Sequence, residues 1–152
     1  MRKRDNLADD MIILCSTAVG TETAQKGIRA LCRYFGGQMI YVPLRDDAGD
    51  SAEKIRGVLA DAVGDRPARQ MLDKLMIRFG GLQIYIPLER YAFRKIIALE
   101  IYERNYNKGI PINDLAGDYN ISFTFAYTLW REGQREKHHK TLPYLPFLEF
   151  LH

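Results

Sequence analysis

Apolar residues recur every three or four positions in two stretches of the N-terminal half of the chain. The apolar positions are Ala24, Ile28, Leu31, Cys32 and Phe35 in the first stretch, and Ala68, Met71, Leu72, Leu75, Met76 and Phe79 in the second. This spacing puts the apolar side chains on one face of a helix, where a core can cover them. The pattern therefore predicts two amphipathic helices.

A shorter helical stretch precedes each amphipathic helix, and the two cover about residues 6–18 and 52–63. We expect each to end near a glycine, Gly20 or Gly64, because glycine adopts a left-handed turn at the least cost. The residue that follows, Thr21 or Asp65, is of a type that favours the N-cap of the next helix. The pattern therefore predicts two pairs of helices, each joined by a tight turn.

A Gly-Gly pair ends each amphipathic helix, and a short apolar segment follows it. The segments, residues 38–42 and 82–86, are rich in β-branched and aromatic residues, and a proline closes each of them. Because such a short strand is not stable alone, we expect the two to pair antiparallel, within the chain or across a dimer. The residues assigned to this strand and dimerisation element are Gly36, Gly37, Ile40, Tyr41, Gly80, Gly81, Ile84 and Tyr85.

The two helix-helix-strand patterns are also similar in sequence. Residues 14–44 and 58–88 align without a gap at an offset of 44 positions. The alignment pairs Ala18-Val19-Gly20 with Ala62-Val63-Gly64, and Phe35-Gly36-Gly37 with Phe79-Gly80-Gly81. We interpret residues 1–88 as a duplicated dimerisation region with copies at about 11–44 and 55–88.

The pattern changes after residue 88. A wide apolar face predicts a long helix from Tyr91 to Tyr106, and residues 107–111 break it. Residues 112–131 then have the spacing of a helix-turn-helix, with apolar side chains at Ile112, Leu115, Ala116, Tyr119, Ile121, Ala126 and Leu129. We therefore predict a helix-turn-helix DNA-binding domain at residues 89–140.

Three residues of this motif have the chemistry that the turn requires. Ala116 is small, as the residue must be where the second helix crosses close by. Asn120 stands where the turn needs a positive φ angle, which asparagine tolerates better than any residue except glycine. Ser122 is a suitable N-cap for the second helix.

The outward face of the second helix is the candidate DNA-reading surface. Its residues are Ser122, Phe123, Thr124, Tyr127, Thr128, Arg131 and Arg135. Basic residues continue beyond the motif, at Lys137, His138, His139 and Lys140. The second helix also carries Phe123, Phe125, Tyr127 and Trp130, and so much aromatic surface is the reason to keep a protein interface as the competing interpretation.

Two segments of the chain are distinctive, namely Phe79-Gly80-Gly81-Leu82-Gln83-Ile84-Tyr85-Ile86-Pro87 and Leu115-Ala116-Gly117-Asp118-Tyr119-Asn120-Ile121-Ser122. With them, the chain resembles the Mor/C middle-operon transcription activators of Mu-like phages over about residues 55–135. The resemblance implies a dimer that intertwines at its N-terminus, reads double-stranded DNA with two helix-turn-helix units and recruits the bacterial RNA polymerase. It also implies that the strand, here with Gln83 and Tyr85, approaches the DNA minor groove. The family has this dimerisation module once per chain, whereas the repeat here provides it twice.

Composition changes this picture little. The chain has 152 residues, of which 47% are hydrophobic and 27% charged, and a net charge of +3, which suits one or two small globular domains. The longest apolar run, residues 11–15, is too short to span a bilayer. Acidic residues follow the basic N-terminus where the apolar part of a signal peptide would begin. We expect a cytoplasmic protein that makes no membrane contact.

No arrangement of residues predicts catalysis or metal binding. Cys15 and Cys32 stand alone in apolar surroundings, so we expect reduced core thiols. His138, His139 and His152 have no cysteine or carboxylate at ligand spacing, and no catalytic triad can be assembled from them. We therefore expect a protein that is not an enzyme and that uses no metal and no cofactor.

Taken together, the sequence predicts a mainly α fold with a small two-stranded antiparallel β element and a C-terminal helix-turn-helix. The predicted function is sequence-specific DNA binding in transcription regulation, as a homodimer and, by the resemblance, as an activator. The alternative is a protein-interaction module that binds a partner regulator through the aromatic helix and the apolar tail at residues 141–152, without reading DNA. We expect this tail to pack on the chain or on a sister subunit.

Overall fold

A computed structural model describes residues 7–45 and 49–141, with the backbone alone for residues 139–141. The chain divides into two units, and the boundary lies between Ala92 and Phe93, compared with the predicted boundary after residue 88. The apolar tail expected at the C-terminus lies outside the described residues from residue 142 onward. No helix in the described part of the chain is long and apolar enough to cross a membrane.

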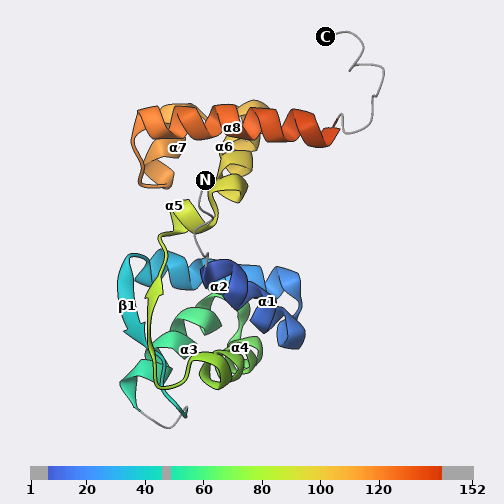
Figure 1. The fold of residues 1–152 in the computed structure, drawn as a ribbon. Helices are drawn as coiled ribbons and strands as arrows, with labels where there is room; N and C mark the ends of the chain where they lie inside the picture. The colour runs from blue at the N-terminus through green and yellow to red at the C-terminus, as the bar shows by residue number, and fades with distance from the viewer. Residues whose placement is uncertain (1–6, 46–48, 142–152) are drawn as a thin grey trace, which may run out of the picture. The chain divides into compact units, whose positions relative to one another are not determined.

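Helices dominate both units (Figure 1). The N-terminal unit contains α1 (Leu7–Val19), α2 (Thr21–Phe35), β1 (Gln38–Tyr41), α3 (Asp50–Val63), α4 (Asp65–Phe79), β2 (Gln83–Ile86) and α5 (Glu89–Ala92). The C-terminal unit contains α6 (Arg94–Lys108), α7 (Ile112–Asp118) and α8 (Phe123–Thr141). The predicted fold class, mainly α with one small antiparallel sheet, is confirmed.

A single glycine joins the two helices of each pair in the N-terminal unit. Gly20 has φ 84° and ψ 160°, and Gly64 has φ 92° and ψ 163°. Only glycine populates this region readily, so the break falls on the glycine and the next residue is already helical. The expected N-caps Thr21 and Asp65 are therefore wrong by one residue, because the glycines themselves occupy the cap position.

The strands β1 and β2 pair antiparallel within the chain, with Ile40 opposite Ile84 and Met39 opposite Tyr85. They lie side by side along one side of the helices α1–α4 (Figure 1). Along β2 the side chains alternate: Ile84 and Ile86 are buried, and Gln83 and Tyr85 are exposed. The ribbon therefore has one face in the core and one face in solvent, as the alternation of side chains along a strand requires.

The core of the N-terminal unit comes from equivalent faces of its four long helices. Its largest fully buried side chains include Met11, Ile28, Leu31, Leu59, Met71 and Leu72. One charged group also connects α2 to the segment after β2, because the Glu89 carboxylate accepts hydrogen bonds from Arg29, at 2.6 Å, and from Arg33. Burial alone would raise the pKa of Glu89, but the hydrogen bonds and charges of Arg33 and Arg29 outweigh burial and lower it.

In the C-terminal unit α8 packs along α6, and α7 packs on both helices. The helix predicted from Tyr91 to Tyr106 is interrupted at Phe93, which has φ −118° and ψ 28° and caps α6 by accepting the Ile97 N–H at 2.9 Å. Hydrophobic periodicity does not detect a break of one residue, because the apolar spacing continues through it. The predicted break within residues 107–111 is confirmed, but α6 continues two residues past the expected end at Tyr106, because Gly109 is the residue that ends it in the left-handed conformation.

Two helices and a tight turn form at residues 112–131, as the motif predicts. Leu115, Ala116, Ala126 and Leu129 are buried. Asn120 has φ 54°, and no other described non-glycine residue has a positive φ. The Ser122 hydroxyl accepts the Phe125 N–H at 3.1 Å, so its expected role as the N-cap of α8 is confirmed.

The contact between α6 and α8 depends on Gly133. A Cβ atom added to Gly133 would lie 2.1 Å from the carbonyl oxygen of Ala98 and 2.8 Å from Cβ of Tyr102. We expect Gly133→Ala to destabilise the C-terminal unit by about 1–3 kcal/mol, because the helices would have to separate. Urea unfolding followed by the fluorescence of Trp130, the one tryptophan of the chain, measures this loss.

Gly117 provides the matched control, since it is helical and a Cβ there would meet nothing within 4 Å. We expect Gly117→Ala to be neutral or to stabilise the unit by up to about 1 kcal/mol, through helix propensity. Equal effects of the two alanines would contradict the close helix contact.

The turn gives a second prediction. Since Asn120 is already in the left-handed region, Asn120→Gly should be neutral or slightly stabilising. Asn120→Val should cost about 1–2 kcal/mol, because a β-branched side chain is strained at positive φ. The same tryptophan signal measures both variants, and a harmless valine would show that the turn has another conformation.

Candidate nucleic-acid interface

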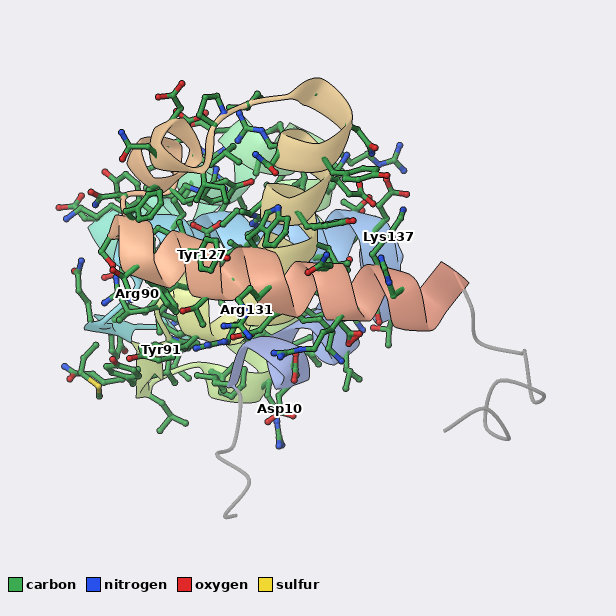
Figure 2. The ribbon with its side chains drawn as sticks, turned by 90° about the horizontal axis from the view of Figure 1, so that it is seen from above. Asp10, Arg90, Tyr91, Tyr127, Arg131 and Lys137 are labelled. Carbon is green, nitrogen blue, oxygen red and sulfur yellow. The ribbon has the colours of Figure 1, made fainter. Side chains whose placement is uncertain are left out.

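One continuous face of α8 is open to solvent. All the residues proposed from the sequence to read DNA there are exposed, namely Ser122, Phe123, Thr124, Tyr127, Thr128, Arg131 and Arg135. Ala126, Leu129 and Gly133, on the opposite side of the helix, are buried. Tyr127 and Arg131 both project from α8 (Figure 2). The helix therefore has the two-sided pattern of an element that packs on one side and binds on the other.

Hydroxyl groups at the start of α8 differ in their availability. The Ser122 hydroxyl is used to cap the helix, and the Thr128 hydroxyl donates to the carbonyl oxygen of Thr124 at 3.0 Å. The Thr124 hydroxyl makes no hydrogen bond within the described part of the chain and is exposed. Thr124 is thus the hydroxyl on this face that is most available to an external partner.

The aromatic side chains of α8 are less exposed than the sequence indicates. Phe123 and Tyr127 are 52% and 44% exposed and stack with ring centroids 6.5 Å apart. Phe125 and Trp130 are half-buried. The Arg94 guanidinium lies over the Phe125 ring, and Trp130 donates its indole N–H to Asn105 at 3.0 Å. The expected four-residue aromatic surface is therefore wrong, because two of its members anchor α8 to α6.

Ion pairs between α6 and α8 neutralise much of the charge along the helix. Glu132 binds Arg94 through two hydrogen bonds of 2.6 and 3.0 Å, and these lower the pKa of Glu132. Lys95 pairs with Glu136 at 3.0 Å. Lys137, counted from the sequence among the basic residues beyond the motif, pairs with Glu103 at 2.9 Å and so takes part in packing.

Arg131 and Arg135 remain as cations of the exposed face. Neither forms an ion pair with any residue that the structure describes, and both are exposed. His138 is exposed too, while the side chains of His139 and Lys140 lie outside the described part of the chain. An anion that approached this face of α8 would therefore meet two exposed guanidinium groups, of which Arg135 also helps to lower the pKa of the nearby Glu132.

The first helix of the motif is held in place by its last turn. Arg104 of α6 binds Asp118 at 3.0 Å and lies over the Tyr119 ring, and Tyr119 donates its hydroxyl to Glu100 at 2.9 Å. Burial raises the pKa of Tyr119, so the phenol remains a hydrogen-bond donor at neutral pH. These contacts fix α7 and the turn, and thereby the start of α8.

The residues assigned to the strand element lie in the N-terminal unit. Gln83, Tyr85 and Tyr41 are exposed on the outer face of the ribbon, Ile84 is buried and Ile40 is half-buried. The four glycines of the two Gly-Gly pairs stand where the helices turn into the strands; Gly37 has φ 83° and Gly81 has φ 85°. A Cβ on Gly36 or Gly80 would lie 2.3 or 2.4 Å from the carbonyl oxygen of the preceding helical turn.

The sequence did not single out three further exposed side chains of this unit. Met39, which lies opposite Tyr85, is 56% exposed. Arg90 and Tyr91 of α5 are exposed, and the guanidinium of Arg90 lies 5.8 Å from the centre of the Tyr91 ring (Figure 2). The strand register predicts which face of the ribbon Met39 lies on, once the pairing of the strands is known. The short helix α5 was missed because one long helix was expected to begin at Tyr91.

The two cysteines have no reactive environment. Both are free and buried, and burial raises the pKa of each thiol to about 12. Cys15 donates a weak hydrogen bond to the carbonyl oxygen of Met71 at 3.8 Å. The described part of the chain brings together no three His, Cys, Asp or Glu side chains that could hold a metal ion.

Comparison with known proteins identifies a family. The sequence model of the Mor transcription activator family matches residues 44–145, a range that includes α3, α4, β2 and the whole of the α7–turn–α8 segment. No curated protein and no solved structure matches the chain. Because the family match spans more than half of the 152 residues, the chain belongs to the Mor transcription activator family, whose members are DNA-binding activators of transcription and not enzymes.

Proposed function

We propose that the exposed face of α8 reads base pairs in the major groove of duplex DNA, while α7 and the turn fix the angle at which α8 enters. The observation that carries this proposal is the separation of α8 into a buried side and an exposed side that ends in two exposed arginines. An α-helix fits the major groove, and the residues near its N-terminus are those that usually reach base edges.

The side chains of this face divide between base and backbone contacts. Thr124 has the free hydroxyl near the start of the helix, and Phe123 offers an apolar edge suited to a thymine methyl group. Arg131 and Arg135 lie further along α8 and suit phosphates or guanine. Ser122, Tyr127 and Thr128 complete the surface, with the hydroxyls of Ser122 and Thr128 already engaged within the helix.

A second DNA contact is proposed for the strand ribbon. Gln83 and Tyr85 are exposed on the same face of β2, and Tyr41 and Met39 are their direct partners on β1. Amide and phenol groups can both hydrogen-bond in the minor groove, where the pattern of donors and acceptors is simple. The resemblance to the Mor/C activators supports this role of the strand.

Activation requires a protein partner as well as DNA. By the same resemblance, we propose that the partner is the bacterial RNA polymerase, bound next to the activator at a promoter. Phe123 and Tyr127 show that α8 also has exposed aromatic surface, so an interaction module that binds only proteins is the alternative that the binding experiment tests. The homodimer expected from the sequence stays a prediction, and the pairing of β1 with β2 within one chain supports the competing proposal of a single closed chain; the mass of the free protein decides between them.

Selection of bound duplexes from a random pool, followed by titration at several salt concentrations, tests DNA reading. We expect Arg131→Ala and Thr124→Ala each to weaken binding to the selected sequence by about 1–3 kcal/mol. Arg131→Ala should also reduce the dependence of affinity on salt, because one cation fewer neutralises the DNA. Both residues are exposed, so the fold should not change.

Lys95→Ala is the matched control, since it removes the same charge from the same unit at a residue whose side chain is 71% exposed and paired with Glu136. It should bind the selected sequence within about twofold of the wild type. Weak binding that neither salt nor these substitutions change would reject DNA reading by α8 and favour the interaction module.

A further inference from the structure

The N-terminal unit has the contact pattern of a symmetrical dimer within one chain. Gly36 lies against Leu88, and Gly80 lies against Leu44, which are the same two positions displaced by 44 residues. Gly37 donates its N–H to the Ile86 oxygen at 2.8 Å, and Gly81 donates its N–H to the Val42 oxygen at 2.7 Å. In a two-fold interface, residue i of one copy contacts j of the other, and j contacts i. The two segments meet in the same reciprocal way.

Two pairs of equivalent residues meet each other directly, which places them on the approximate two-fold axis. Ile40 is opposite its equivalent Ile84 in the ribbon. In the helices, a Cβ on Gly27 would lie 2.5 Å from Cε of Met71, which is its equivalent. Identical modules would place each of these residues against a copy of itself.

The residues on the helical part of the axis have diverged in size. Gly27 leaves the space that the Met71 side chain fills, and Met71 is fully buried. Two modules of the Met71 type would bring two long side chains into space for one, and two of the Gly27 type would leave a cavity. Complementary sizes therefore favour pairing of unlike modules over pairing of like modules.

Charge divergence acts in the same direction. Arg29 and Arg33 of α2 bind Glu89, which directly follows the second module. The position equivalent to Arg29 is Asp73. If two second modules paired with each other, Asp73 would face Glu89 in place of the arginine, and two carboxylates would approach where an ion pair now forms.

We propose that the first module, residues 7–44, is a built-in complementary partner that occupies the pairing surface of the second module, residues 50–88. A single chain is then a closed unit, and it binds DNA as one copy with one helix-turn-helix. Few residues connect the modules, and a short connection gives a high effective concentration for pairing within the chain. The family match begins at residue 44 and so leaves the first module outside it. The DNA clause rests on the proposed function, whereas closure of the chain does not.

Light scattering or sedimentation of the full chain at micromolar concentration tests closure directly. We expect a mass near 17.5 kDa for the free protein and one chain per duplex in the DNA complex. A free protein with the mass of two chains would overturn the proposal. Failure to bind any duplex would reject the proposed function and leave the result for the free protein in place.

Disulfide trapping identifies which chains pair. Met39 and Tyr85 are direct partners in the ribbon and both are exposed, so Met39→Cys with Tyr85→Cys places two thiols across the strands. We expect oxidation to give a crosslink within one chain, and a covalent dimer would overturn the proposal. The single variants are the controls, and the buried native thiols, with pKa values of about 12, should stay reduced.

Exchange of the axis residues tests their complementarity. We expect Gly27→Met and Met71→Gly each to lower the melting temperature of the N-terminal unit by at least about 5 °C. The double variant, which restores one methionine and one glycine on the axis, should recover at least half of the combined loss. Circular dichroism measures the melting, and Trp130 fluorescence reports whether the C-terminal unit is unaffected. Losses that simply add would overturn the assignment of these residues to a shared axis.

If Gly27→Met does not fold, Gly27→Ala provides a smaller test of the same contact. An added Cβ would lie 2.5 Å from Cε of Met71, the movable end of a buried side chain, so we expect Gly27→Ala to have a lower melting temperature than its control. Gly57→Ala, at a helical glycine with nothing within 4 Å, is its control and should leave the melting temperature unchanged or raise it.

Discussion

The antiparallel pairing of β1 with β2 is the interaction on which the N-terminal unit depends. Fixing Ile40 opposite Ile84 also fixes where the two helix pairs meet, because each strand directly follows a helix. A slip of one residue would turn Ile84 and Ile86 outward and Tyr85 inward. Burial of one ribbon face therefore holds the register. The register in turn leaves Gln83 and Tyr85 on the outer face, where the proposed DNA contact needs them.

In the C-terminal unit, the close approach of α8 to α6 determines which residues remain available for binding. Gly133 lets the helix backbones approach, and Arg94, Lys95 and Lys137 then reach carboxylates across the contact. These ion pairs neutralise the charges beside the contact, so the guanidinium groups that α8 exposes to solvent are those of Arg131 and Arg135. The packing side of the helix thus defines the binding side.

Much of this could be predicted from the sequence, because glycines and hydrophobic spacing are local signals. The repeat predicted both helix pairs and both strands, and the motif predicted the positive φ of Asn120 and the Ser122 cap. The break at Phe93 was missed because one non-helical residue does not disturb the periodicity. The half-burial of Trp130 and the pairing of Lys137 were missed because both depend on a partner in α6, far away in the sequence.

The proposed closure of the chain by two unlike modules would change which DNA sites the protein can read. A symmetrical homodimer with two heads is matched to a two-fold operator, whereas a closed chain with one α8 can use a site without that symmetry. The affinity of such a closed chain for DNA is lower than that of a two-headed dimer, because each neutralised phosphate adds to binding and a single α8 exposes few cations. If the protein recruits RNA polymerase as proposed, the two binding events are linked. Bound polymerase then raises the affinity of the activator for DNA by the same factor by which bound DNA raises its affinity for polymerase. A single-headed activator would therefore hold its site most firmly when polymerase is bound beside it.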